Sequence, residues 1–233
     1  MPDVERPSPL PLLLLLLSLT TGLVDAVSVL GLGKVFTANM TGNVVFLGFA
    51  LAGTPGFVVG PFLVALLTFM TGALAAGRIG KRMSGRPLRH WLLTAAVFEA
   101  ALLWGAAAIA MRFDVADQAP RWALYAIIAA TAVAMGFRNA TIRQLKVPDL
   151  TTTVLTLTIT GIAADSSLAK GGNPNWGRRI GSVAAILGGA ALGALLVVRT
   201  GSLVLPLILA GALVLVGTAL CAVHPSAIEP VGH

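Results

Sequence analysis

Long runs of apolar residues dominate this chain, and short polar segments separate them. Six runs reach or approach the roughly 20 residues that a helix needs to cross the hydrocarbon core of a bilayer. They cover residues 10–32, 57–76, 91–111, 122–137, 180–198 and 203–223. Two further runs, at 44–52 and 154–164, are too short to cross. The pattern predicts an all-α polytopic membrane protein with six full spans and two short segments.

One short segment has an ambiguous period. From Thr153 to Thr160, threonines alternate with Val, Leu and Ile, which is the two-residue period of a strand. An isolated strand cannot lie in lipid, because its backbone groups would have no hydrogen-bond partners. This stretch is therefore either a helix with a Thr-lined face or irregular backbone buried inside the protein.

Two parts of the chain resemble each other, and each is followed by the same order of apolar runs. The aligned pairs are Gly22 with Gly136, Asp25 with Asn139, Lys34 with Lys146 and Thr41 with Thr153. Many transporters consist of two such related halves. We therefore expect membrane halves at 10–111 and 121–223, a connecting loop at 112–120, and tails at 1–9 and 224–233.

Composition and charge narrow the class further. Of 233 residues, 57% are hydrophobic and only 11% are charged, whereas a soluble domain is about one quarter charged. This excludes a soluble globule and a disordered chain. A single cysteine excludes an internal disulfide. The net charge of +7 fits basic cytoplasmic loops, so we expect no nucleic-acid partner.

The basic residues also bear on topology. If all eight runs cross, the best orientation leaves six basic residues outside and ten inside. If each short segment instead enters and leaves on one side, with the N-terminus inside, four lie outside and twelve inside. The second arrangement obeys the positive-inside rule better and makes the second half inverted. Each half then has three full spans and one re-entrant segment; eight crossing helices remain the alternative.

Asp25 is the clearest charged residue at membrane depth. It shares a small, polar helix face with Ser18, Thr21, Gly22 and Ser28. Such a face points into the bundle, because a charge facing lipid costs several kcal/mol. Asp25 is therefore either a solute or proton site, or the partner of an interhelical hydrogen bond or of an arginine such as Arg138.

Two other charged positions lie within or directly after predicted spans. Arg138, next to Asn139, is either an anion contact or an arginine that reaches the membrane surface. Glu99 lies eight residues into its span. It is either a protonated structural residue, which we favour, or a proton relay.

The short segments begin with the densest polarity, namely Asn39, Thr41 and Asn43 in the first and Thr151 and Thr152 in the second. Asn and Thr are common helix N-caps. A helix that starts at membrane depth points its free N–H groups at the interior, and interrupted helices build transporter sites in this way. The alternative is ordinary capping at the membrane surface.

Glycine and alanine recur every four residues at Gly181, Ala185, Gly189 and Gly193. Stripes of small residues of this kind mark close helix packing, and a homo-oligomer could use these Gly-rich faces.

Catalytic patterns are absent, because the three histidines, His90, His224 and His233, fall in loops or the tail. We therefore expect no metal, no cofactor and no enzymatic activity.

The stretches 21–26 and 36–43, with Asp25, Asn39 and Asn43, resemble the YoaK-like family, and 136–140 and 147–156 resemble its second block. The match runs from about Leu10 to Val223. The resemblance implies a bacterial integral membrane protein with several helices and no established substrate.

These observations lead to one main hypothesis. The chain is expected to be a multi-pass protein of the bacterial inner membrane that transports or conducts a small polar or anionic solute. Its site would consist of Asp25, Asn39, Thr41, Asn43, Arg138, Asn139, Thr151 and Thr152. Asp25 would bind a proton or a counter-charge. The alternatives are a structural or partner-binding membrane protein and, ranked last, a membrane enzyme.

Overall fold

The computed structural model describes residues 9–83, 85–145 and 155–224. Within these ranges the chain forms eight α-helices, one short 3-10 helix and no β-strand, so the all-α prediction is confirmed. The helices are α1 (Leu10–Gly31), α2 (Met40–Leu51), α3 (Val59–Met83), α4 (Leu88–Ala110), α5 (Arg121–Leu145), α6 (Leu155–Ala164), η1 (Ser167–Ala169), α7 (Trp176–Thr200) and α8 (Val204–Ala222).

Six helices are long and apolar enough to cross a membrane, namely α1, α3, α4, α5, α7 and α8. The other two, α2 and α6, have 12 and 10 residues and are about 18 and 15 Å long, against a hydrocarbon core of about 30 Å. Six spans and two short segments were predicted, and both are confirmed. The alternating threonines from position 155 onward lie in a helix, α6, not in a strand.

Two spans continue beyond their apolar runs. The third helix, α3, extends to Met83 and includes Arg78, Lys81 and Arg82, and α5 extends to Leu145. Long cationic side chains can keep their stems against apolar surface while their charged ends reach water. They also interact favourably with a helix C-terminus. The apolar run therefore predicted too early an end for both helices.

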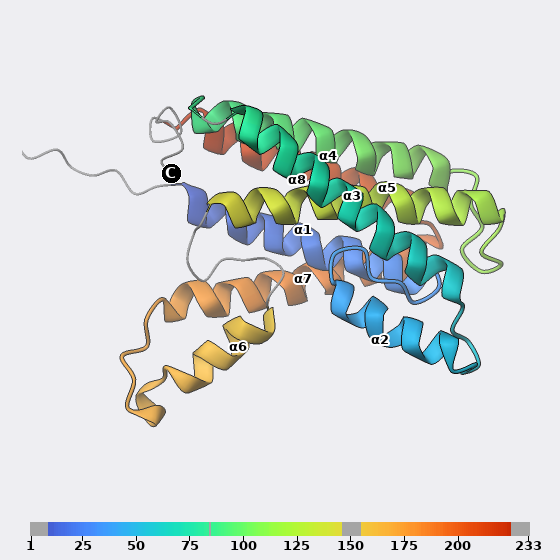
Figure 1. The fold of residues 1–233 in the computed structure, drawn as a ribbon, viewed down its shortest axis with the longest axis horizontal. Coiled ribbons are helices and arrows are strands. Elements are labelled where there is room, and N and C mark those ends of the chain that lie inside the picture. The colour runs from blue at the N-terminus through green and yellow to red at the C-terminus, as the bar shows by residue number, and fades with distance from the viewer. Residues whose placement is uncertain (1–8, 84, 146–154, 225–233) are drawn as a thin grey trace, which may run out of the picture.

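Neighbouring residues give the direction of each span. The second turns of α1 and α7 lie together, because a Cβ added at Gly181 would contact Leu15. The end of α1 lies against the start of α8, where Leu203 packs on Gly31. The first turns of α3 and α5 meet where Gly60 faces Tyr125. Leu17 in the first half of α1 accepts a hydrogen bond from Arg138 in the second half of α5, so these two helices run in opposite directions, as Figure 1 shows.

These directions define two faces of the bundle. The Lys34 face carries the loops at 32–39, 52–58, 111–120 and 201–203, and the Arg82 face carries the other described loops. Among the described residues, four basic side chains belong to the Lys34 face, namely Lys34, Arg112, Arg121 and Arg199. Nine belong to the Arg82 face, namely Arg78, Lys81, Arg82, Arg86, Arg89, Arg143, Lys170, Arg178 and Arg179.

The short helix α2 has its preceding and following loops on the same face. Lys34, before α2, places its Nζ 4.9 Å from the ring centroid of Phe57, after α2. The other short helix, α6, ends beside the start of α7, where Arg179 pairs with Asp165 at 2.7 Å. Figure 1 shows α2 beside α3 and α6 beside α7 at the edge of the bundle. For α2, this geometry favours a re-entrant segment over a crossing helix.

Glycines let two helix pairs pack at the backbone. A Cβ added at Gly22 of α1 would lie 2.1 Å from the carbonyl oxygen of Ile186 in α7, and one at Gly189 would lie 1.8 Å from that of Leu19. The pair of α3 and α5 repeats both contacts, with Gly136 against Phe69 at 2.0 Å and Gly72 against Val133 at 2.1 Å. Only a glycine allows such an approach. The predicted packing role of small residues is confirmed at Gly189.

Candidate functional site

Asp25 lies near the middle of the bundle and binds the loop that leads into α2. Its Oδ1 accepts hydrogen bonds from the backbone N–H groups of Thr37 at 3.2 Å and Ala38 at 2.9 Å. The Asn39 side chain donates a further bond to Oδ2. Asp25 is six residues before the end of α1, or about 9 Å along the helix axis. The chain therefore leaves α1, folds back by this distance, and then starts α2.

Asn43, in the first turn of α2, holds the same loop from the other side. Its Oδ1 accepts from the backbone N–H of Phe36 at 2.9 Å, and its Nδ2 donates to the Phe36 carbonyl. Asn43 is fully buried. Because one carboxamide satisfies both backbone groups of Phe36, the loop keeps its hydrogen bonds although it has no regular secondary structure. The Thr37 hydroxyl is buried there, and no described residue offers it a hydrogen-bond partner.

Asn139 connects this loop to the second half of the chain. Its Nδ2 donates to the Ala38 carbonyl at 3.4 Å. The loop from Phe36 to Asn39, which we call the α2 entry loop, is thus bound by side chains of α1, α2 and α5. The carboxylate of Asp25 also lies just before the N-terminus of α2, where the free N–H groups favour negative charge.

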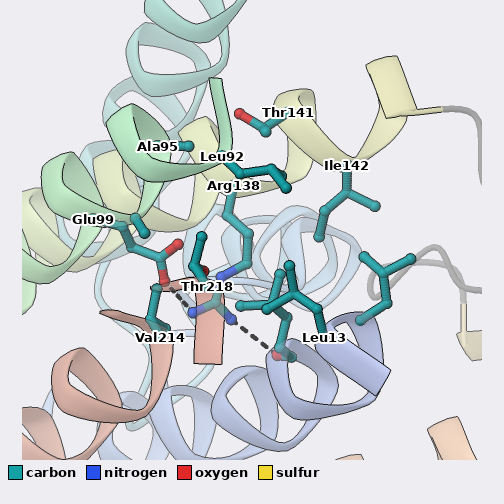
Figure 2. A pocket seen from close by; sticks show the side chains of 12 residues that line it. Leu13, Leu92, Ala95, Glu99, Arg138, Thr141, Ile142, Val214 and Thr218 are labelled. Carbon is teal, nitrogen blue, oxygen red and sulfur yellow. Dashed lines mark hydrogen bonds and ion pairs between the residues drawn. The ribbon is translucent and has the colours of Figure 1, made fainter. Parts of the chain in front are cut away.

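Arg138 and Glu99 form a second polar cluster. The Nη2 of Arg138 on α5 pairs with Oε1 of Glu99 on α4, and both residues are 3% exposed. The Nη1 of Arg138 donates to the Leu17 carbonyl and to the Thr21 hydroxyl of α1, each at 3.0 Å. Figure 2 shows the guanidinium between Glu99 and α1. A buried pair is tolerated only when both charges keep such partners.

The structure brings together some of the predicted site residues. Asp25, Asn39, Asn43 and Asn139 surround the α2 entry loop. Arg138 forms its ion pair with Glu99, not with Asp25, and Arg143 is exposed at the end of α5. Thr41 does not join the cluster, because it is exposed on α2. Thr151 and Thr152 lie outside the described residues.

Two polar residues outside the predicted site lie at these clusters, Thr37 in the entry loop and Thr141 near Arg138. Glu99 was singled out without a partner. The charge pattern could have supplied one, because Glu99 is the only charged residue of the run 91–111 and Arg138 directly follows the uncharged run 122–137. Opposite charges at membrane depth usually pair.

The polar groups of the candidate site form hydrogen bonds. The entry-loop cluster contains one carboxylate and three carboxamides, all engaged with backbone or with each other. No group of three or more His, Cys, Asp or Glu that could hold a metal ion occurs among the described residues. Such a cluster can bind a small polar solute only if the loop exchanges its hydrogen bonds for those of the solute.

Comparison with known proteins places the chain in a family. The model of a family described as "Protein of unknown function (DUF1275)" matches residues 13–220. The chain belongs to the DUF1275 family. It is 31% identical, over 155 residues, to "UPF0700 transmembrane protein YoaK" of Bacillus subtilis (strain 168). That alignment covers 66% of this chain and 66% of the relative. No solved structure matches.

Family membership agrees with the architecture. The relative is described as a transmembrane protein, and this DUF1275 chain has six helices suited to crossing a membrane. It is therefore a multi-pass membrane protein. The predicted resemblance to YoaK-like proteins is confirmed.

Proposed function

We propose that this protein is a transporter or channel for a small polar or anionic solute in the bacterial inner membrane. The observation that carries the proposal is the α2 entry loop, which returns about 9 Å toward the bundle centre before α2 begins, and there binds Asp25. Non-helical backbone at membrane depth occurs where it is buried in protein or lines a cavity. In secondary transporters, interrupted helices of this kind surround the solute.

The recurring glycine contacts support two related halves. Gly22 and Leu19 in α1 have counterparts in Gly136 and Val133, each 114 positions later. Gly72 and Phe69 in α3 have counterparts 117 positions later in α7. Since α1 and α5 run in opposite directions, such a repeat is inverted. Inverted repeats with a site between them are typical of alternating-access transporters.

The proposed solute ligands are the polar groups that now bind the entry loop. Asn39, Asn43 and Asn139 offer neutral carboxamides, and Asp25 offers a carboxylate for a proton or counter-charge. Thr151 and Thr152 would join them from outside the described residues. The excess of basic residues on the Arg82 face makes that face cytoplasmic under the positive-inside rule.

Flux through reconstituted protein tests this proposal. Proteoliposomes are shifted into a panel of small neutral amides, polyols and potassium salts of small anions, and shrinkage and reswelling are followed by light scattering. We expect at least one solute to enter faster than into empty vesicles. Asp25→Asn and Asn39→Ala should slow this entry tenfold or more, whereas Asp117→Asn, in an exposed loop, should not.

The results can contradict the proposal in two ways. Unchanged flux in folded Asp25→Asn and Asn39→Ala would show that the site is wrongly placed. If no probe enters vesicles that contain the wild-type protein faster than empty vesicles, the proposed transport function itself is contradicted. Protein elution and thermal unfolding in detergent confirm that each variant is folded.

One observation favours a second candidate, a structural or partner-binding membrane protein without transport. Asp25, Asn39, Asn43 and Asn139 are engaged with the chain itself, so they serve the fold in the state described. Under this alternative, substitutions at these positions alter stability only, and no solute flux depends on them.

A further inference from the structure

A small, partly open space lies beside the Arg138–Glu99 ion pair. Side chains of α1, α4, α5 and α8 surround it, and its volume is about 30 Å³. Figure 2 shows these side chains around the Arg138 guanidinium. Most of the lining is apolar, but four lining residues are polar or charged, namely Glu99, Arg138, Thr141 and Thr218. We call this space the α5 cavity.

Two buried polar atoms at the α5 cavity have no partner within the described part of the chain. They are Nε of Arg138 and Oγ1 of Thr141, in residues that are 3% and 4% exposed. A buried donor without a partner costs free energy comparable to its desolvation. Thr131, on the same helix, behaves differently, because its hydroxyl donates to the Ile127 carbonyl at 2.7 Å. A buried threonine of α5 can therefore bond its own helix, and Thr141 at the cavity does not.

Size and charge define what can occupy the cavity. A volume of about 30 Å³ holds roughly two water molecules, which excludes most organic solutes. The charges of Arg138 and Glu99 offset each other at the cavity wall, so neither an anion nor a cation would gain a net attraction. A water molecule needs two to four polar partners in such a place, and the lining supplies them.

We propose that the α5 cavity is a binding site for one or two ordered water molecules. A water beside Arg138 accepts its Nε–H, and a water beside Thr141 exchanges hydrogen bonds with its hydroxyl. Water-mediated bonds of this kind are nearly as favourable as direct ones. The site completes the set of partners of the Arg138 guanidinium, whose Nη atoms already bind Glu99 and α1. It is independent of whether the protein transports a solute.

Two valine substitutions test the proposal through the direction in which each shifts the midpoint of thermal unfolding. In an occupied cavity, Thr141→Val removes a partner of the water and lowers the midpoint of thermal unfolding in detergent, whereas Thr141→Ser retains it. In a dry cavity, Thr141→Val replaces an unpaired hydroxyl by a methyl group and leaves the midpoint unchanged or raises it. Thr131→Val is the matched control, and we expect a smaller shift there because that hydroxyl bonds only its own helix.

X-ray hydroxyl-radical footprinting of the wild type gives a second measurement that needs no variant. Radicals form from bound water, so we expect oxidation of the buried side chains of Leu92 and Ile142, which line the cavity. Leu103 and Ile127, buried away from the cavity, are the matched controls. Oxidation of Leu92 and Ile142 at the level of Leu103 and Ile127, or an unchanged or raised midpoint in Thr141→Val, would overturn the proposal.

Discussion

At the scale of single residues, the buried charges of this protein are bound in two different ways. Asp25 is bound mainly by backbone N–H groups and one carboxamide. Glu99 is bound by a guanidinium that also reaches two groups of α1. Both arrangements keep a charge in hydrogen bonds away from water, which is the condition for placing it at membrane depth.

The Arg138–Glu99 pair leads to a stability prediction. Glu99→Gln leaves the guanidinium of Arg138 buried without its counter-charge, and breaking a buried pair in this way costs about 3–5 kcal/mol. We expect a correspondingly lower midpoint of unfolding in detergent. The double variant Glu99→Leu with Arg138→Met should recover much of the loss, because it removes both charges together.

The matched control is the pair of Arg179 with Asp165, in which the Asp165 side chain is 45% exposed. The Arg179 side chain is 10% exposed, so this pair is only partly exposed. Because water screens an exposed carboxylate, Asp165→Asn should lower the midpoint by less than Glu99→Gln does. An equal loss in Glu99→Gln and Asp165→Asn would show that the burial of the Arg138 pair does not determine its contribution.

The residues of the site could be predicted from the sequence better than the partners that they contact. Asp25, Asn39 and Asn139 stand out because polar groups are rare in apolar runs, so their inward position could be predicted. Their contacts depend on a loop that folds back along α1, and no local pattern encodes that path. For the same reason, the alternatives for Arg138 could be resolved only when α4 and α5 were placed side by side.

At the scale of helices, backbone contacts at glycine hold α1 to α7 and α3 to α5. The stripe that includes Gly189 and Gly193 faces α1, so these glycines serve packing within the chain. The predicted homo-oligomer through Gly-rich faces stays a prediction, and it would need surfaces other than these two positions. Gly188, by contrast, has no atom near the position of a Cβ.

Alanine substitutions at two adjacent glycines of α7 should therefore differ in their effect on stability. Gly189→Ala would place a Cβ 1.8 Å from the Leu19 carbonyl oxygen, and the helices must separate, at a cost of about 1–3 kcal/mol. Gly188→Ala should be neutral or stabilising, by up to about 1 kcal/mol. Unfolding midpoints in detergent measure both, and equal midpoints would contradict the backbone contact.

The spans themselves were predictable, because lipid imposes a length and a composition on every crossing helix. Their ends were less so, as α3 and α5 show, because Arg and Lys can extend a helix past its apolar run. The helical state of α6 could not be deduced from its alternating threonines. It follows from the need of a backbone to satisfy its own hydrogen bonds in a membrane.

At the scale of the molecule, the re-entrant path of α2 predicts which loops share a face. Lys34 and Thr54 lie on the Lys34 face, and Lys170 lies on the Arg82 face. In a Cys221→Ser background, which has no other cysteine, a membrane-impermeant maleimide should label Lys34→Cys and Thr54→Cys from one side. It should label Lys170→Cys from the other side. Labelling of Lys34→Cys and Thr54→Cys from opposite sides would instead indicate a crossing α2.

The glycine contacts also determine where the molecule can change shape. Backbone packed directly on backbone leaves no side chains to slide, so α1 with α7 and α3 with α5 behave as two stiff units. In a rearrangement, these two units would then move relative to each other at the seam, the interface where Arg138 of α5 contacts Leu17 of α1. Opening this seam would carry Asn139 away from Ala38, freeing one side of the entry loop while Asp25 still holds the other.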